Sequence, residues 1–122
     1  MGDISVIIAG REAPESAQAL YSTVHGAGRV MSRTRAAGRK RWRRGKLAVE
    51  SEGEISRGMM ERWIAEFNEV ELRGAGTDES PHVYKRLPEV LEHHGATIQV
   101  LHTLMPIGVA MAGADEFDPY RD

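Results

Sequence analysis

The chain has no cysteine, only seven aromatic residues and no long apolar run. Without cysteine it can form neither a disulfide framework nor a thiolate metal site. No apolar segment approaches the length of a membrane span, and the first residues lack the basic and apolar regions of a secretory signal. We therefore expect a cytoplasmic protein that is not attached to a membrane.

The charges are unevenly distributed along the 122 residues, which are enough for one domain. Nine Lys and Arg residues and no acid lie between Gly26 and Val49, so the remainder holds 7 basic and all 18 acidic residues. A basic block in an otherwise acidic chain predicts a polyanionic partner such as RNA. The candidate RNA contacts in this block are Arg41, Arg43 and Arg44, with Trp42 stacking on a base. The block also fits a solvated loop, which we prefer as its structure because no apolar residue recurs in it.

The pattern of apolar residues predicts short strands mixed with about three helices. We expect strands at 4–9, 21–24, 70–72, 97–104 and 107–111, and helices at 30–37, at 58–68 and from Pro88 onward. The first strand is apolar and β-branched and should be buried. Residues 38–56 change from basic to acidic and are expected to form a loop or linker, and residues 114–122 an acidic tail. This order of elements favours the α+β class.

The most informative stretch is His-Gly-Ala-Gly-Arg-Val-Met-Ser-Arg, residues 25–33. Gly26 and Gly28 can adopt positive φ, so the backbone N–H groups around them can form a nest for an anion. A helix beginning near Val30 would add its dipole, and arginine binds phosphate oxygens through a planar fork. A neutral imidazole has a free ring nitrogen, so His25 could attack the α-phosphorus of a nucleotide. The alternative is a tight turn that leads into a basic helix.

The other candidate metal ligands do not define a site. His93 and His94 are adjacent and so point away from each other on a helix, and their place before Gly95 has an adequate structural explanation. Asp78 and Glu79 could bind a metal or orient a base, but acids are also favoured at a helix N-terminus. We therefore predict no metal site within the chain.

Four segments together resemble the RtcB-type RNA ligases. These are Met1 to Val6 (Met-Gly-Asp-Ile-Ser-Val), the stretch 25–33, Asp78 to Lys85 (Asp-Glu-Ser-Pro-His-Val-Tyr-Lys) and Leu104 to Val109 (Leu-Met-Pro-Ile-Gly-Val). They occur in the family's order and extend over most of the chain.

The resemblance implies a GTP- and manganese-dependent ligase that joins RNA 3′-phosphate or 2′,3′-cyclic phosphate ends to 5′-hydroxyl ends, in RNA repair or tRNA splicing. It implies that His25 carries the guanylate, that Ser5 and Tyr84 line the GMP pocket, and that Arg33 holds an RNA phosphate. The remaining residues expected to bind the nucleotide are those of the loop, Gly26, Ala27, Gly28 and Arg29. The RNA partners would be tRNA halves or broken RNA ends.

The chain departs from this family in two respects. The family is several times longer, and its manganese ligands lie upstream of the part present here. Met111 occupies the position where the family usually has a lysine. We therefore expect an incomplete, C-terminal portion of such a ligase that does not ligate without an upstream metal-binding part. The alternatives are a non-catalytic module that binds RNA or phosphate, and a decayed remnant.

Overall fold

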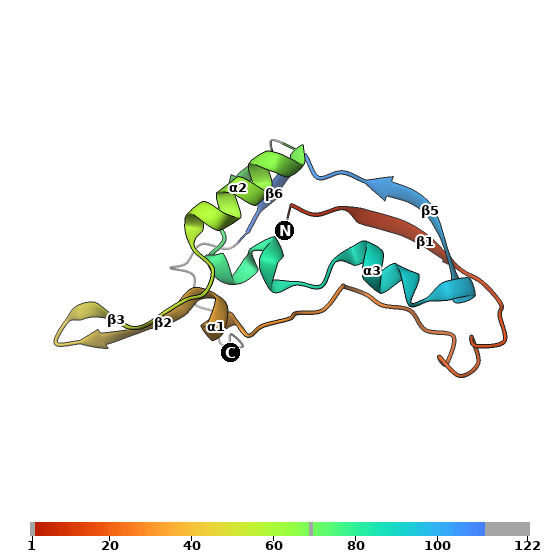
Figure 1. Cartoon of the computed structure of the whole chain (residues 1–122), viewed down its shortest axis with the longest axis horizontal. Helices are drawn as coiled ribbons and strands as arrows, with labels where there is room; N and C mark the ends of the chain where they lie inside the picture. The colour runs from red at the N-terminus through yellow and green to blue at the C-terminus, as the bar shows by residue number, and fades with distance from the viewer. Residues whose placement is uncertain (1, 69, 112–122) are drawn as a thin grey trace.

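The computed structural model describes residues 2–68 and 70–111, and over these residues three α-helices alternate with short strands and 3₁₀ turns (Figure 1). The predicted α+β class is confirmed. The predicted tail at 114–122 lies outside the described residues. Every helix in the described part is too short or too polar to traverse a lipid bilayer.

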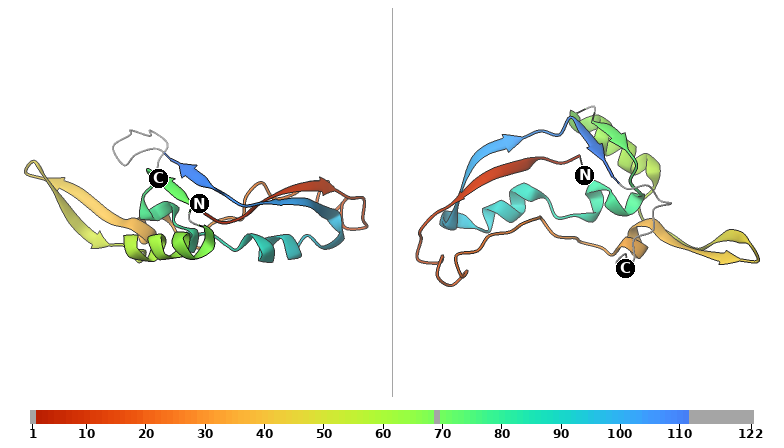
Figure 2. Two further views of the ribbon diagram at one scale, coloured as in Figure 1. Left: turned by 90° about the horizontal axis from the view of Figure 1, so that it is seen from above. Right: turned by 180° about the vertical axis from the view of Figure 1, so that it is seen from behind.

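The strands form three separate two-stranded sheets, seen from two further sides in Figure 2. Two sheets are antiparallel and one is parallel: β1 (Ser5–Gly10) pairs with β5 (Ile98–Leu104), β2 (Gly38–Arg43) with β3 (Lys46–Glu52), and β4 (Glu71–Arg73) in parallel with β6 (Gly108–Ala110). The first sheet joins residues near the start of the chain to residues near position 100. The strands predicted at 4–9, 70–72, 97–104 and 107–111 therefore exist, each with slightly different ends.

The helices begin and end where capping residues allow it. In α1 (Arg33–Ala37) the Ser32 side chain accepts a hydrogen bond of 3.1 Å from the Arg35 N–H, and Gly38, with φ of 76°, ends the helix. This helix starts three residues later than predicted. In α2 (Arg57–Asn68) the Ser56 hydroxyl accepts from the Met59 N–H at 3.2 Å. The first turn of α3 (Leu87–Glu92) contains a proline, as predicted from Pro88.

The core is small and lies around α2. One cluster contains Ala36, Ile55 and Val83, and the other contains Met60, Ile64 and Val70, with Trp63, Leu72 and Val109 packed against the second. The apolar stripe predicted on α2 thus packs inward at Met60 and Ile64. The residues of the first cluster hold α1 and the segment around Val83 together.

Three predictions about elements were wrong. Residues 21–24 form no strand, and Tyr21 has a φ of 51°, which interrupts an extended conformation. Residues 38–52 form a β-hairpin rather than a loop, because the cross-strand pairing does not require an apolar repeat. The first strand is not buried, and Ile7 within it is 47% exposed.

Candidate functional site

A cavity of about 640 Å³ collects residues from widely separated parts of the sequence. Ser5 comes from β1, His25, Gly26 and Ala27 come from the loop before α1, and Tyr84 follows the 3₁₀ turn Pro81–Val83. Five of the residues predicted to bind the nucleotide or to react with it therefore line one cavity. Its volume lies within the range typical of small-molecule sites.

His25 is exposed at this cavity. Its ring makes no hydrogen bond or ion pair within residues 2–68 and 70–111. An imidazole that is accessible and has no protein partner retains a ring nitrogen that can approach a phosphorus atom. The geometry is therefore compatible with the predicted nucleophile.

The glycine loop differs in part from the predicted anion nest. Gly28 has a φ of 82°, but Gly26 is not in the left-handed region. The Val30 N–H donates to the Val83 carbonyl at 2.8 Å and is therefore unavailable to an anion. Helix α1 begins at Arg33, and this residue does not line the cavity. The prediction that a helix beginning near Val30 directs its dipole at the anion site is therefore wrong.

A short antiparallel bridge brings Tyr84 to the loop that carries His25. Arg29 pairs with Tyr84, and the Lys85 N–H donates to the Gly28 carbonyl at 2.9 Å. Lys85 also lines the cavity, although it is not among the site residues predicted from the sequence. Its position directly after Tyr84 in the Asp78 to Lys85 motif was the available signal.

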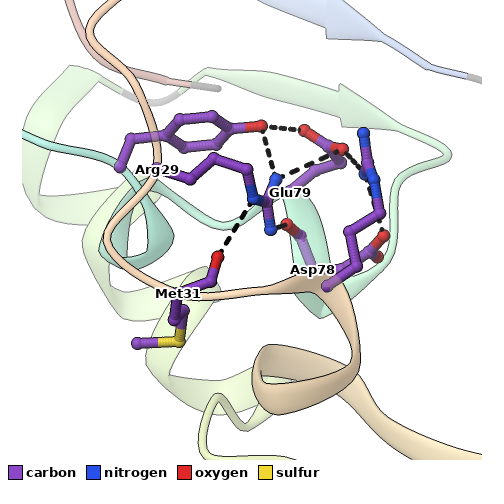
Figure 3. Close-up of polar contacts among 6 residues, drawn as sticks. Arg29, Met31, Asp78 and Glu79 are labelled. Atoms are coloured by element: carbon purple, nitrogen blue, oxygen red, sulfur yellow. Dashed lines mark hydrogen bonds and ion pairs between the residues drawn. The ribbon is translucent and has the colours of Figure 1, made fainter. Parts of the chain in front are cut away.

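Arg29 is held by several acceptors, as Figure 3 shows. It donates to the Tyr84 hydroxyl at 2.9 Å, to the Asp78 carbonyl at 2.7 Å and to the Met31 carbonyl at 3.1 Å. Its guanidinium also lies 4.9 Å from the centre of the Tyr84 ring. Gly28 and Arg29 do not line the cavity. The contacts of Arg29 instead fix the ring of Tyr84, which does line it.

Two carboxylates complete this cluster. Glu79 accepts hydrogen bonds from the Tyr84 hydroxyl and from Arg33, and its carboxylate lies 3.7 Å from Arg29. Asp78, which is 2% exposed, accepts from Arg33 at 3.1 Å. The sequence left open whether these acids bind a metal or begin a helix. In the fold they lie within the 3₁₀ turn Thr77–Glu79 and hold two arginines.

Burial and hydrogen bonding shift the protonation of this cluster. Burial raises the pKa of the Tyr84 hydroxyl above its usual value, and the hydrogen bond to Glu79 and the charge of Glu79 raise it further. The hydrogen bond to Glu79 also raises the pKa of Arg33, with Asp78 contributing in the same direction. Tyr84 therefore remains a neutral donor, and Arg33 stays charged.

The other predicted RNA-binding residues lie elsewhere. Arg41 and Arg43 are exposed on β2 and Arg44 is in the turn that follows, on a hairpin that extends away from the rest of the chain (Figures 1 and 2). Arg33 faces carboxylates in the cluster. The structure thus separates the predicted residues into a cavity, a polar cluster and an exposed arm.

No three His, Asp or Glu side chains within residues 2–68 and 70–111 gather in a way that could hold a metal ion. His82 instead packs edge-on against Trp63, with ring centres 5.1 Å apart, and lies 3.0 Å from the Ser80 hydroxyl. His94 lies 3.4 Å from the Val24 N–H. These contacts have a structural role.

Comparisons with known proteins agree with the motif resemblance. The family described as tRNA-splicing ligase RtcB matches residues 1–112. The RNA-splicing ligases RtcB of Mycobacterium bovis and Mycobacterium tuberculosis are each 34% identical over 110 residues, which cover 88% of this chain and 22% of the relative. The chain thus spans about a fifth of the length of these curated relatives. No solved structure matches it. The extent of the family match and the identity to both relatives place the chain in the RtcB family of RNA ligases.

Proposed function

We propose that this chain contributes the guanylate-accepting centre of a GTP-dependent RNA ligase, with His25 as the nucleophile. The observation that carries the proposal is the cavity shared by His25, Ser5 and Tyr84, which lie far apart in the sequence. Family membership supports RNA ligation as the reaction class. The substrates are RNA 3′-phosphate or 2′,3′-cyclic phosphate ends, such as those of tRNA halves or broken RNA.

In the first step, a ring nitrogen of neutral His25 attacks the α-phosphorus of GTP. A phosphorus–nitrogen bond forms, the bond from that phosphorus to the bridging oxygen breaks, and pyrophosphate leaves. An oxygen of the RNA 3′-phosphate then attacks the same phosphorus and releases His25. Finally, the RNA 5′-hydroxyl attacks the activated RNA phosphate, loses its proton to solvent and displaces GMP. A 2′,3′-cyclic phosphate must first be opened by water.

The neighbours of His25 have separate roles in this proposal. Ser5 and Tyr84 line the pocket for the nucleoside part of GMP, and Gly26 and Ala27 allow the phosphate to approach the backbone closely. Lys85 supplies positive charge at the cavity. Gly28 and Arg29 act indirectly, because the bridge and the guanidinium contacts hold Tyr84 in place. Arg33 contacts an RNA phosphate when it exchanges a carboxylate for that anion.

Manganese does not fit residues 2–68 and 70–111, because no set of three suitable ligands gathers there. We therefore assign no step to a metal held by these residues. We propose that the Mn²⁺ implied by the family is bound by other residues, and that ligation requires them. The span of about a fifth of the curated relatives supports this requirement.

The rival function is a non-catalytic module that binds RNA, and the exposed basic hairpin favours it. In that case His25 is a structural loop residue. Replacing His25 by alanine would then lower RNA affinity only a little, whereas replacing Arg41, Arg43 and Arg44 would weaken RNA binding and flatten its salt dependence. The two functions therefore differ in the consequence of a single substitution.

Guanylate transfer is tested with GTP labelled at the α-phosphate. The chain is incubated with this GTP and Mn²⁺, alone and together with a mycobacterial relative that lacks the matching 110 residues. We expect acid-labile label on this chain only in the mixture, and none with His25→Ala. Label that persists in His25→Ala would refute the role of His25, and label on the chain alone would refute the need for further residues.

A second measurement does not depend on reconstitution. We expect GMP to shift the amide resonances of Gly26 and Ala27 in the isolated chain, because both residues line the cavity. The exposed Gly74 in the turn after β4, which does not line the cavity, serves as the control. Equal shifts at the control, or no shift at the cavity, would contradict the GMP pocket.

A further inference from the structure

The β2–β3 hairpin has no obvious role in the core. Every residue of β2 after Gly38 is exposed, and Figures 1 and 2 show the hairpin extending from the end of α1 away from the other sheets. An isolated two-stranded hairpin is marginally stable in water, so its persistence depends on how it is attached.

The attachment to the core is tight. A Cβ at Gly38 would lie 2.3 Å from the Ser51 carbonyl oxygen, and a Cβ at Gly53 would lie 2.2 Å from the Ala36 carbonyl oxygen. Beyond the strands, the Ile55 N–H donates to that same Ala36 carbonyl at 3.0 Å. Because Ala36 and Ile55 are both core residues, the base of the hairpin is fixed to the core while its far end is free.

The far end carries a dense positive charge. Over Gly38–Glu52 there are six basic residues and two acids, and both acids lie on the return strand near the base: Arg39, Lys40, Arg41, Arg43, Arg44, Lys46, Glu50 and Glu52. Glu50 lies 4.0 Å from Arg39 and 3.7 Å from Arg41. Charge in excess of these pairings is therefore available to an anion, whereas the chain as a whole has a net charge of −2.

The turn also retains an arginine at a structural cost. Arg44 has a φ of 50° and Gly45 a φ of 74°, which together match the backbone of a tight hairpin turn. Asn or Gly adopts the first of these positions more easily than arginine does. A positive charge thus stands at the tip in a conformation that another residue would favour.

Trp42 gives one face of the hairpin an aromatic surface. Cross-strand partners share a face, so the Lys40–Val49 pair and Trp42 are on one side and the Arg41–Ala48 and Arg43–Lys46 pairs are on the other. Trp42 is 71% exposed. The other tryptophan, Trp63, instead packs beneath Arg86 at 4.4 Å and beside His82. An exposed indole beside a lysine on the same face is suited to stacking on an unpaired base while the lysine holds a phosphate.

We propose that the hairpin is an arm that binds single-stranded RNA, with Trp42 stacking on a base beside Lys40 on one face, and Arg41 and Arg43 holding the backbone from the other face. The proposal rests on the proposed function only in taking RNA as the substrate. It adds that the bound stretch is unpaired, because bases stacked in a duplex are not open to an indole face. The arm holds RNA apart from the cavity that contains His25.

The test measures binding of the full chain to a fluorescent single-stranded RNA and to a blunt RNA duplex of equal length at several salt concentrations. Trp42→Ala should weaken binding of the single strand about tenfold with an unchanged salt slope, and should leave duplex binding unchanged. Trp42→Phe should restore most of the affinity. The fluorescence of Trp63 shows whether Trp42→Ala is folded.

The charge contribution is tested by the triple variant Arg41→Gln, Arg43→Gln, Arg44→Gln. It should weaken binding and reduce the slope of log affinity against log salt by about 2, since each phosphate contact contributes about 0.7 to 0.9. The matched control is Arg57→Gln, Arg62→Gln, Arg73→Gln, which removes three exposed charges from α2 and β4 and should change binding less than twofold.

Four results would overturn the proposal. These are equal losses on single strand and duplex with Trp42→Ala, no loss with it, an equal effect of the control triple, or hairpin-dependent binding to phosphatidylserine vesicles without RNA binding. Guanylylation at His25 is measured separately in the same variants. Hairpin-dependent RNA binding without labelling would support the RNA-binding arm and refute the catalytic proposal. Labelling without hairpin-dependent RNA binding would support the catalytic proposal and refute the RNA-binding arm.

Discussion

The nine residues from His25 to Arg33 contain two regions that the fold treats differently. His25, Gly26 and Ala27 line the cavity, and the His25 ring is exposed. Arg29 and Arg33 are instead held by Asp78, Glu79 and Tyr84 through hydrogen bonds and ion pairs. One motif thus combines an accessible region, which we call the open part, with an anchored part. The anchored part therefore contributes stability and fixes the position of the open part.

Removal of the Glu79 carboxylate should have the largest effect on stability. Glu79→Ala removes the acceptor that the partly buried Arg33 shares with the Tyr84 hydroxyl, and the carboxylate that lies 3.7 Å from Arg29. We expect the free energy of unfolding to fall by about 3 kcal/mol, measured by urea denaturation. The control is Glu61→Ala, which removes an exposed partner of Arg57 and should cost about 0.5 kcal/mol or less. Equal effects of the two changes would mean that the cluster does not anchor the motif.

Val83→Ala weakens the same anchored part by removing core packing next to it. Val83 is fully buried against Ala36 and Ile55, and its carbonyl accepts from the Val30 N–H. Loss of two methyl groups together with the resulting cavity should reduce the unfolding free energy by about 2 kcal/mol. Val100→Ala, on the exposed β5, is the matched control and should cost less than half as much. A comparable loss at the control would show that the packing around Val83 is not specific.

Tyr84 lines the cavity and also contacts the anchored Arg29, and Tyr84→Phe removes only its hydroxyl. The hydroxyl donates to Glu79 and accepts from Arg29 at 2.9 Å, so we expect a loss of about 1 kcal/mol at neutral pH. Tyr21→Phe, at a residue that is 74% exposed, should have no measurable effect. A larger effect at Tyr21 would contradict this assignment.

The same hydroxyl predicts a dependence on alkaline pH. Because burial and Glu79 raise the pKa of Tyr84 in the folded state, the folded protein holds this proton more tightly than the unfolded chain does. The stabilisation is complete below the unfolded pKa of about 10 and is lost as the pH rises through the folded pKa. Urea denaturation between neutral pH and pH 11 should therefore show a steeper loss for the parent chain than for Tyr84→Phe. Parallel curves would rule this contribution out.

His25→Ala should have the smallest effect on stability. The ring is exposed and makes no hydrogen bond or ion pair within the described part of the chain, so the unfolding free energy should change by less than about 0.5 kcal/mol. The same substitution should abolish guanylate labelling in the reconstituted mixture. A large loss of stability would place His25 in the anchored part and weaken its assignment as a nucleophile.

Several elements could be read directly from the chain. The stripe of Met60 and Ile64 predicted α2, and the glycine at position 38 marked the end of α1. The alternation in Ile98–Leu104 predicted β5. These features depend on spacing within one segment, so a local pattern is sufficient to reveal them.

Other features depended on partners that the local pattern does not contain. Residues 39–43 were predicted to form a solvated loop because apolar residues do not recur among these charged residues. In the structure they instead pair with β3. Residues 21–24 looked like a strand, but no neighbouring strand pairs with them in the described part of the chain. Arg33 was expected to meet an RNA phosphate, and in the structure it faces Asp78 and Glu79. That expectation stays a prediction.

The linear order of residues established the RtcB motifs, the helix α2, the end of α1 at Gly38, and the separation of basic from acidic segments. It could not establish which distant groups meet. The pairing of β1 with β5, the bridge between Arg29 and Tyr84 and the shared acceptor at Glu79 join residues dozens of positions apart. Such contacts form only when packing offsets the entropy lost in closing long loops, and that balance depends on the whole fold. The cavity around His25 is therefore a product of the tertiary structure, although five of the residues that line it (Ser5, His25, Gly26, Ala27 and Tyr84) had been predicted as site residues.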